Sequence, residues 1–97
     1  MKVNWSDAAE ADLVAILLYV AADDEDAAFR LVDKLERAGN ALAGFPRRGR
    51  PGRVQGTREL VVPRTRYLLV YEINDERLDI IRVMHGARAW PSNDLDS

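Results

Sequence analysis

Residues 57–84 read TRELVVPRTRYLLVYEINDERLDIIRVM, and this stretch decides the fold. It holds three segments rich in β-branched and aromatic residues, which run from Thr57 to Val62, from Arg66 to Ile73 and from Arg77 to Met84. Only three residues separate each segment from the next. Connections this short predict an antiparallel meander of three strands.

The middle segment is apolar on both of its faces. Alternate residues from Tyr67 to Ile73 share one face, while Leu68 and Val70 on the other face are also apolar. This pattern predicts a central strand that is covered on both sides.

The start of the chain predicts a short strand followed by a helix. Lys2 to Trp5 has a strand-like pattern, and Ser6 or Asp7 then offers a side-chain oxygen to the free amides of a helix that runs to about Ala22. Glu10 is placed to complete a capping box with Asp7.

A second helix is predicted after Asp23 and Asp24, which break the first helix and can cap the next one. Its apolar residues repeat at helical spacing and are Ala28, Leu31, Val32, Leu35, Ala38 and Leu42. Gly39 weakens this helix by about 1 kcal/mol relative to alanine, and Gly44 with Pro46 marks its end. The two helices predict an antiparallel hairpin, and the order of elements is β-α-α-β-β-β.

The first helix is apolar nearly all round in its last three turns. One stripe has the spacing of a buried face and comprises Ala9, Leu13, Ile16, Leu17 and Val20. A second apolar stripe comprises Val14, Leu18 and Ala21. In a domain this small, one sheet and one neighbouring helix do not readily cover both stripes, so we expect an exposed strip that awaits a partner. The alternative is complete burial inside the monomer.

The composition of the chain limits its class. Its 97 residues allow one domain, which we place at 1–91, with a polar tail at 92–97. The chain has no cysteine, which excludes disulfides, thiolate nucleophiles and thiolate zinc sites, and we expect neither a metal nor a cofactor. The longest apolar run, Leu13 to Ala22, is about half of the length that crosses a membrane, and the N-terminus lacks the pattern of a signal peptide. We therefore expect a soluble cytoplasmic protein that does not enter a membrane.

The formal net charge of −2 conceals an asymmetry along the chain. Residues 1–46 carry four basic and nine acidic residues, a net charge of −5, whereas residues 47–88 carry ten arginines and five acidic residues, a net charge of +5. Glycine and proline interrupt the stretch from Pro46 to Gly56, which is therefore predicted to be an exposed basic loop. Its arginines are Arg47, Arg48, Arg50 and Arg53. Arginine suits contacts with carboxylates or phosphates, so the expected partner is an acidic peptide, a nucleic acid or a protein machine that handles nucleotides, unless these charges are simply solvated.

Several short motifs match a known family in order and spacing. They are Trp5-Ser6 before the hairpin, Phe45-Pro46 with Gly49-Arg50, and the segments Gly56 to Val62, Tyr67 to Tyr71 and Ile81 to Arg88. From Val3 to about Pro91 the chain resembles the RelE/ParE superfamily of toxins from type II toxin–antitoxin systems. The resemblance implies an α+β fold in which a helical hairpin packs on a twisted antiparallel sheet. It also implies a cognate antitoxin whose flexible segment wraps the toxin and neutralises it.

The implied antitoxin would cover the apolar first helix. An amphipathic antitoxin segment is expected there, and the arginines would receive acidic residues of the same peptide. The residues expected to bind the antitoxin are Val14, Leu17, Leu18 and Tyr19.

The resemblance leaves two branches open for the cellular target. RelE-like toxins cut messenger RNA on the ribosome without a metal, with a general base and cationic side chains, whereas ParE-like toxins bind and poison DNA gyrase and are not nucleases. For RNA cutting, the catalytic candidates are Arg58, Arg82 and His85. Contacts with the target or with a nucleic acid are assigned to Arg47, Arg48, Arg50, Arg53, Arg66 and Arg88.

Two departures from the RelE-like pattern favour the ParE-like branch. Leu68 stands in the central strand where such nucleases carry a basic residue, and Trp90, which we expect to dock on the core, stands where they often place a tyrosine. Strand alternation also puts Arg82 and His85 on opposite faces, unless the strand ends or bulges near Met84. We therefore prefer a gyrase poison, with a messenger-RNA interferase second and a non-toxic antitoxin-binding module third.

Overall fold

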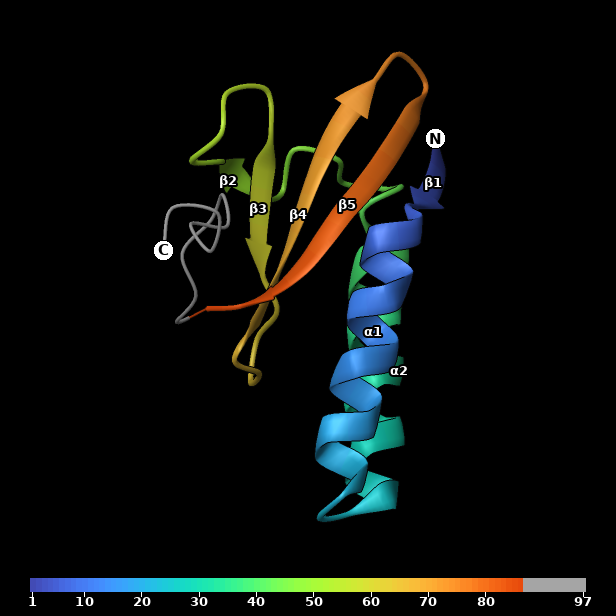
Figure 1. Cartoon of the computed structure of the whole chain (residues 1–97). Coiled ribbons are helices and arrows are strands. Elements are labelled where there is room, and N and C mark those ends of the chain that lie inside the picture. The colour runs from blue at the N-terminus through green and yellow to red at the C-terminus, as the bar shows by residue number, and fades with distance from the viewer. Residues whose placement is uncertain (87–97) are drawn as a thin grey trace.

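The two helices form a hairpin that lies against one face of a five-stranded sheet (Figure 1). The computed structural model describes residues 1–86. In chain order the elements are β1 (Lys2–Trp5), α1 (Asp7–Ala21), α2 (Glu25–Ala41), β2 (Arg50–Pro51), β3 (Arg58–Val61), β4 (Tyr67–Asn74) and β5 (Arg77–His85). The strands lie in the order β1-β5-β4-β3-β2. The predicted α+β architecture is confirmed, with one strand more than expected.

The sheet is mixed, because the antiparallel pairing does not extend to β1. The strands β3, β4 and β5 form the predicted meander, whereas β1 pairs in parallel with β5 and places Lys2 opposite Arg77. The additional strand is β2, whose two residues pair with β3 along one edge. β2 lies in the segment from Pro46 to Gly56 that was predicted to be a loop. A strand of two residues is too short to show the alternating pattern from which strands are predicted.

The first helix begins one residue earlier than a cap at Asp7 would require. Ser6 has an extended backbone, and its hydroxyl accepts a hydrogen bond from the amide of Ala9 at 3.0 Å. The predicted capping box between Asp7 and Glu10 is therefore wrong, because Asp7 is already the first helical residue. The second helix is capped by Asp24, which accepts from the amide of Ala27 at 3.0 Å.

The central strand β4 is buried on both faces, as predicted. On the helix side, Leu69 and Tyr71 belong to a core cluster that also takes residues from both helices and β5. On the opposite side, Leu68 and Val70 pack with Met84 in a second, smaller cluster. The arginine-rich second half of the chain thus supplies most of the strands that hold the core together.

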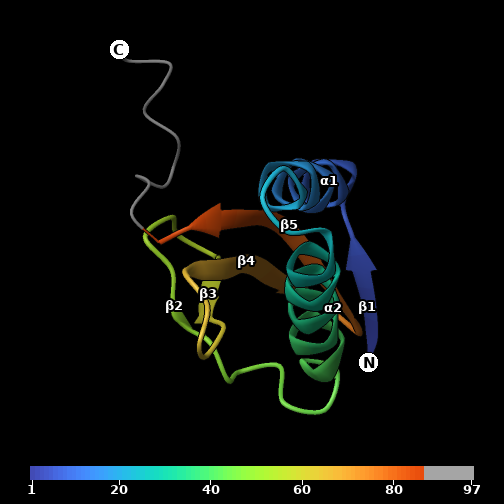
Figure 2. The ribbon, with the colours of Figure 1, turned by 90° about the horizontal axis from the view of Figure 1, so that it is seen from below.

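The first helix buries one side and exposes the other. Its buried residues are Ala9, Leu13 and Ile16, and Leu17 and Val20 are half-buried. Val14, Leu18 and Tyr19 keep 55%, 67% and 79% of their surface exposed. The expectation of an exposed apolar strip is confirmed in this chain, and complete burial is excluded. Seen from below, α1 and α2 lie side by side (Figure 2). Within residues 1–86, neither helix combines the length and the apolar character that crossing a membrane requires.

Candidate functional site

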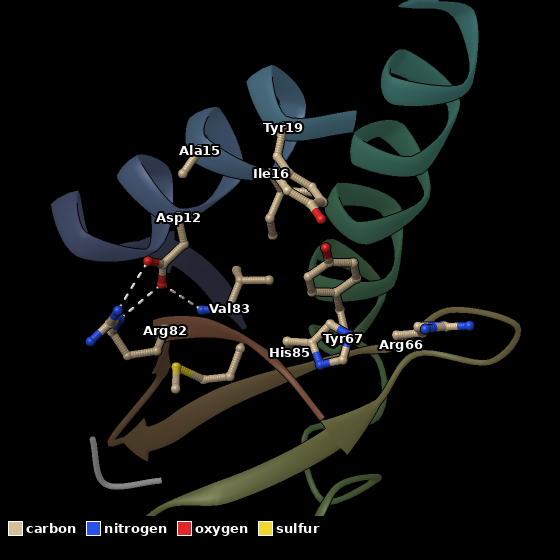
Figure 3. Close-up of a pocket in the computed structure, with 10 residues that line it drawn as sticks. Asp12, Ala15, Ile16, Tyr19, Arg66, Tyr67, Arg82, Val83 and His85 are labelled. Carbon is tan, nitrogen blue, oxygen red and sulfur yellow. Dashed lines mark hydrogen bonds and ion pairs between the residues drawn. The ribbon is translucent and has the colours of Figure 1, made fainter. Parts of the chain in front are cut away.

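A cleft of about 590 Å³ opens between α1 and the ends of β4 and β5 (Figure 3). Asp12 and Tyr19 of α1 contribute to its walls, as do Arg82 and His85 of β5 and Arg66, which directly precedes β4. The cleft therefore brings together two of the three catalytic candidates and one of the predicted target-binding arginines.

Arg82 is held by a carboxylate of the same chain. Its Nε and a terminal nitrogen donate to the two carboxylate oxygens of Asp12 at 2.8 and 3.1 Å. The amide of Val83 donates to the same carboxylate at 2.8 Å. This forked contact fastens α1 to β5, and the Arg82 side chain is only one-third exposed.

Arg82 and His85 both line the cleft, and a β-bulge in β5 lies just before Arg82. Cross-strand pairing shifts from Ile80 opposite Tyr71 to Arg82 opposite Val70, so that Ile81 is an extra residue. The bulge precedes Arg82, and from Arg82 to His85 the pairing with β4 is regular, so strand alternation still puts the two residues on opposite faces, as predicted. Figure 3 shows the two side chains at different ends of the cleft: Arg82 reaches Asp12, and His85 lies near Tyr67. The rings of His85 and Tyr67 meet edge to face, with centroids 5.4 Å apart.

The basic loop is anchored by a buried acid. The Glu59 side chain is 1% exposed and accepts from the Arg53 amide at 2.9 Å, from Arg53 Nε at 3.3 Å and from an Arg50 terminal nitrogen at 3.3 Å. Burial raises the pKa of the Glu59 carboxyl, but the hydrogen bonds from Arg53 and Arg50 outweigh it and hold that pKa below its ordinary value. Two of the loop arginines therefore have an internal partner.

Arg58 also has a role inside the loop. Its Nε donates to the carbonyl of Gly49 at 3.0 Å, and a terminal nitrogen donates to the carbonyl of Arg47 at 3.2 Å. Arg47 and Arg48 are exposed, and within residues 1–86 neither has an ion-pair partner. Arg88, Trp90 and the predicted tail lie outside the described residues.

Two functional partners were missed from the sequence, namely Asp12 and Glu59. Asp12 lies between Ala11 and Leu13 on the sheet-facing side of α1, and Glu59 lies between Arg58 and Leu60 inside β3. An acid within an element that packs on the core was the available signal, because such a group needs a cation or hydrogen-bond donors when it is buried. In the described part of the chain, no group of three or more histidine or acidic side chains is placed to hold a metal ion.

Comparison with known proteins gives matches along nearly the whole chain. The model of a family described as the ParE toxin of the type II toxin–antitoxin system parDE matches residues 3–90. The protein Y4kP of Sinorhizobium fredii is 40% identical over 90 residues, which cover 93% of either chain. The toxin RelE2 of Caulobacter vibrioides is 36% identical over 87 residues, which cover 90% of this chain and 97% of that protein.

A solved structure has a very similar fold. It is described as the chromosomal ParDE TA system from P. aeruginosa, and it superposes with a TM-score of 0.81 at 26% sequence identity. The superposition covers 88% of this chain and 95% of that one.

Proposed function

This chain belongs to the ParE toxin family of type II toxin–antitoxin systems, and from that premise we propose that it arrests bacterial growth by binding DNA gyrase rather than by cutting RNA. The observation that carries the proposal is the internal use of the cations that RNA cutting would need. Arg82 is engaged by Asp12, and Arg58 is engaged by two loop carbonyls.

A phosphate would have to displace these contacts before it could use either arginine. Arg82 would leave a forked carboxylate contact that also fixes the amide of Val83, and such charge-assisted contacts are among the stronger hydrogen bonds in proteins. Leu68, which stands where RelE-like nucleases carry a basic residue, is only 3% exposed and packs in the core. The described residues therefore support a protein that recognises its target by contact and is not a catalyst.

A ribosome-dependent messenger-RNA interferase is the second candidate. It is favoured by the cleft, where Arg66, Arg82 and the imidazole of His85 line one concave surface, and by the similarity to a toxin named RelE2. Histidine is the side chain that most often serves as a general acid or base in catalysis.

We also propose that the exposed strip of α1 binds the antitoxin. Val14 and Leu18, one helical turn apart, expose their apolar side chains, with half-buried Leu17 and exposed Tyr19 beside them. An amphipathic helix that lays its apolar face on these side chains would remove them from water, which is the main driving force of such contacts.

The two candidate targets are separated by adding the purified chain to two purified systems. With DNA gyrase and relaxed plasmid, we expect loss of supercoiling and accumulation of cleaved DNA. With ribosomes programmed with a message, we expect no cleavage of the message.

Two cleft variants sharpen this comparison. His85→Ala and Arg66→Ala remove the proton-transfer candidate and the exposed cation of the cleft, and both should retain full growth inhibition. If ribosomes cut the message and either variant stops the cutting, the gyrase proposal is wrong and the interferase is correct.

A further inference from the structure

The turn that follows α2 presents an aromatic side chain and two arginines to solvent. Phe45 keeps 70% of its surface exposed, and the residues from 44 to 48, which we call the aromatic–arginine turn, line a shallow depression of the surface. Single exposed apolar residues need no explanation. Here, however, hydrogen bonds with side chains of the sheet hold the backbone next to Phe45 in place.

The backbone of the turn is held by buried and half-buried donors from the sheet. The hydroxyl of Tyr71, a fully buried residue of β4, donates to the carbonyl of Pro46 at 2.7 Å and accepts from the amide of Gly49 at 2.8 Å. Arg58 of β3 binds the carbonyls of Arg47 and Gly49. A side chain at Gly49 would lie 2.7 Å from the Tyr71 hydroxyl, so glycine is required for this approach.

This anchoring preorganises a recognition surface. A loop that is already ordered loses little conformational entropy when it binds, so more of the contact energy appears as affinity. Aromatic and arginine side chains are also enriched at the residues that dominate protein–protein affinity. The structure thus fixes the backbone that carries Phe45, Arg47 and Arg48, while Arg50 and Arg53 further along are bound to Glu59.

The chemistry of the turn fits a protein better than a nucleic acid. The depression is lined by glycine, phenylalanine and proline beside the two arginines, which suits an apolar side chain flanked by carboxylates. A protein that binds a nucleic acid strand normally presents a longer row of cations and aromatic stacking surfaces along it. The next arginines of this loop, Arg50 and Arg53, are instead paired with Glu59.

The turn is also separate from the strip of α1. Figure 2 shows the connection from α2 to β2 on the side of α2 that faces away from α1. An antitoxin helix bound to Leu18 and Tyr19 would therefore not contact the turn.

We propose that the chain binds its protein target through the aromatic–arginine turn. The target would contribute an acidic segment whose apolar side chain packs in the depression beside Phe45 and whose carboxylates pair with Arg47 and Arg48. This inference rests on the proposed function of a target-binding toxin. Antitoxin binding belongs to the other face and is independent of it.

The test uses the full chain with Phe45→Ala and, separately, with Arg47→Gln and Arg48→Gln together. Growth inhibition is measured as a function of inducer concentration, and binding of the purified variants to DNA gyrase is measured directly. We expect both variants to lose about tenfold in each measurement, with an unchanged melting temperature and an undiminished complex with the antitoxin. The matched controls are Val61→Ala and Arg64→Gln, which alter an exposed apolar residue and an exposed arginine elsewhere, and both should behave like the parent chain.

The outcomes separate this inference from the proposed function. If the parent chain inhibits gyrase and the turn variants inhibit it equally well, the inference is wrong while the proposed function stands. If the parent chain does not bind gyrase at all, the proposed function fails by itself.

Two further measurements exclude other occupants of the turn. A labelled single-stranded RNA should bind the parent chain and the variants alike, and a loss confined to the variants would overturn the inference in favour of a nucleic acid. Asp94→Asn with Asp96→Asn tests the acids of the chain's own C-terminal segment. Growth inhibition should not change, and a change in either direction would identify that segment as the occupant.

Discussion

Gly39 lowers the stability of α2 locally, and its presence there is explained by contact with Trp5, a residue distant in sequence. It lies inside α2, where glycine is less favourable than alanine by about 1 kcal/mol. A side chain there would lie 2.4 Å from Cζ2 of Trp5 and 2.7 Å from Cδ1 of Ile80. Trp5 also donates from Nε1 to the side-chain oxygen of Asn40 at 3.0 Å. The glycine therefore allows the indole of β1 to pack directly on the helix.

We predict that Gly39→Ala destabilises the fold although alanine favours helix. Inserting a methyl group into this contact should cost about 1–3 kcal/mol, which exceeds the gain in helix propensity. Urea unfolding of the purified chain measures the effect. Gly44→Ala is the matched control, because its nearest neighbour would be a carbonyl at 3.8 Å, and it should unfold like the parent chain. Equal stability of the two variants would refute the packing argument.

At the scale of elements, α1 combines two surfaces with different tasks. Asp12 ties one side to β5, whereas Val14 and Leu18 on the other side are exposed in the part of the chain that the structure describes. Because Leu18 is 67% exposed, changing it should cost the fold little, while an antitoxin that covers it would lose a buried side chain.

We predict that Leu18→Asn escapes neutralisation but keeps its toxicity. The affinity for the antitoxin should fall by about tenfold, so that co-expression of the antitoxin no longer restores growth. Calorimetric titration with the purified antitoxin gives the affinity directly. Val61→Asn, on an exposed position of β3, serves as the control and should bind normally. Normal neutralisation of the Leu18 variant would mean that the antitoxin uses another face.

The regular elements were predictable because their periodicities are local properties of the sequence. The irregular contacts were not, because each depends on two segments far apart in the chain. The bulge at Ile81 follows from the register between β4 and β5, and Ser6 both caps α1 and donates to the Ile81 carbonyl at 3.1 Å. For the same reason the sequence showed Arg82 as a candidate for phosphate contact but did not indicate that Asp12 is its carboxylate partner.

At the scale of the whole molecule, the acidic and basic halves of the chain are joined by specific contacts. Asp12 of the acidic half meets Arg82 of the basic half, and Asn4 of β1 donates to Asp79 of β5 at 3.1 Å. The parallel pairing of β1 with β5, which no local pattern indicated, makes the second contact possible. Two buried acids, Glu59 and Asp79, lie within the basic half.

These two acids should make the fold sensitive to low pH. Burial raises the pKa of the Asp79 carboxyl, but hydrogen bonds from Asn74 and Asn4 and the charge of Arg77 outweigh it and lower that pKa, as the arginines do for Glu59. An acid whose pKa is lower in the folded state stabilises the fold above its unfolded pKa of about 4, and this stabilisation is lost as the pH falls through the folded value. We expect the free energy of unfolding to be nearly constant between about pH 5 and 7 and to decrease below about pH 4.

Substitution of Glu59 distinguishes a specific buried contact from general acid unfolding. Glu59→Gln leaves Arg50 and Arg53 without their shared carboxylate, so it should lower the free energy of unfolding at neutral pH and reduce its dependence on pH below about 4, with the remaining dependence due to groups such as Asp79. Asp33→Asn is the matched control, because Asp33 forms an exposed pair with Arg37, and such pairs contribute little. Urea unfolding at a series of pH values measures both slopes. If the Glu59 variant kept the full acid slope of the parent chain, the buried carboxylate would not be what anchors the basic loop to the sheet.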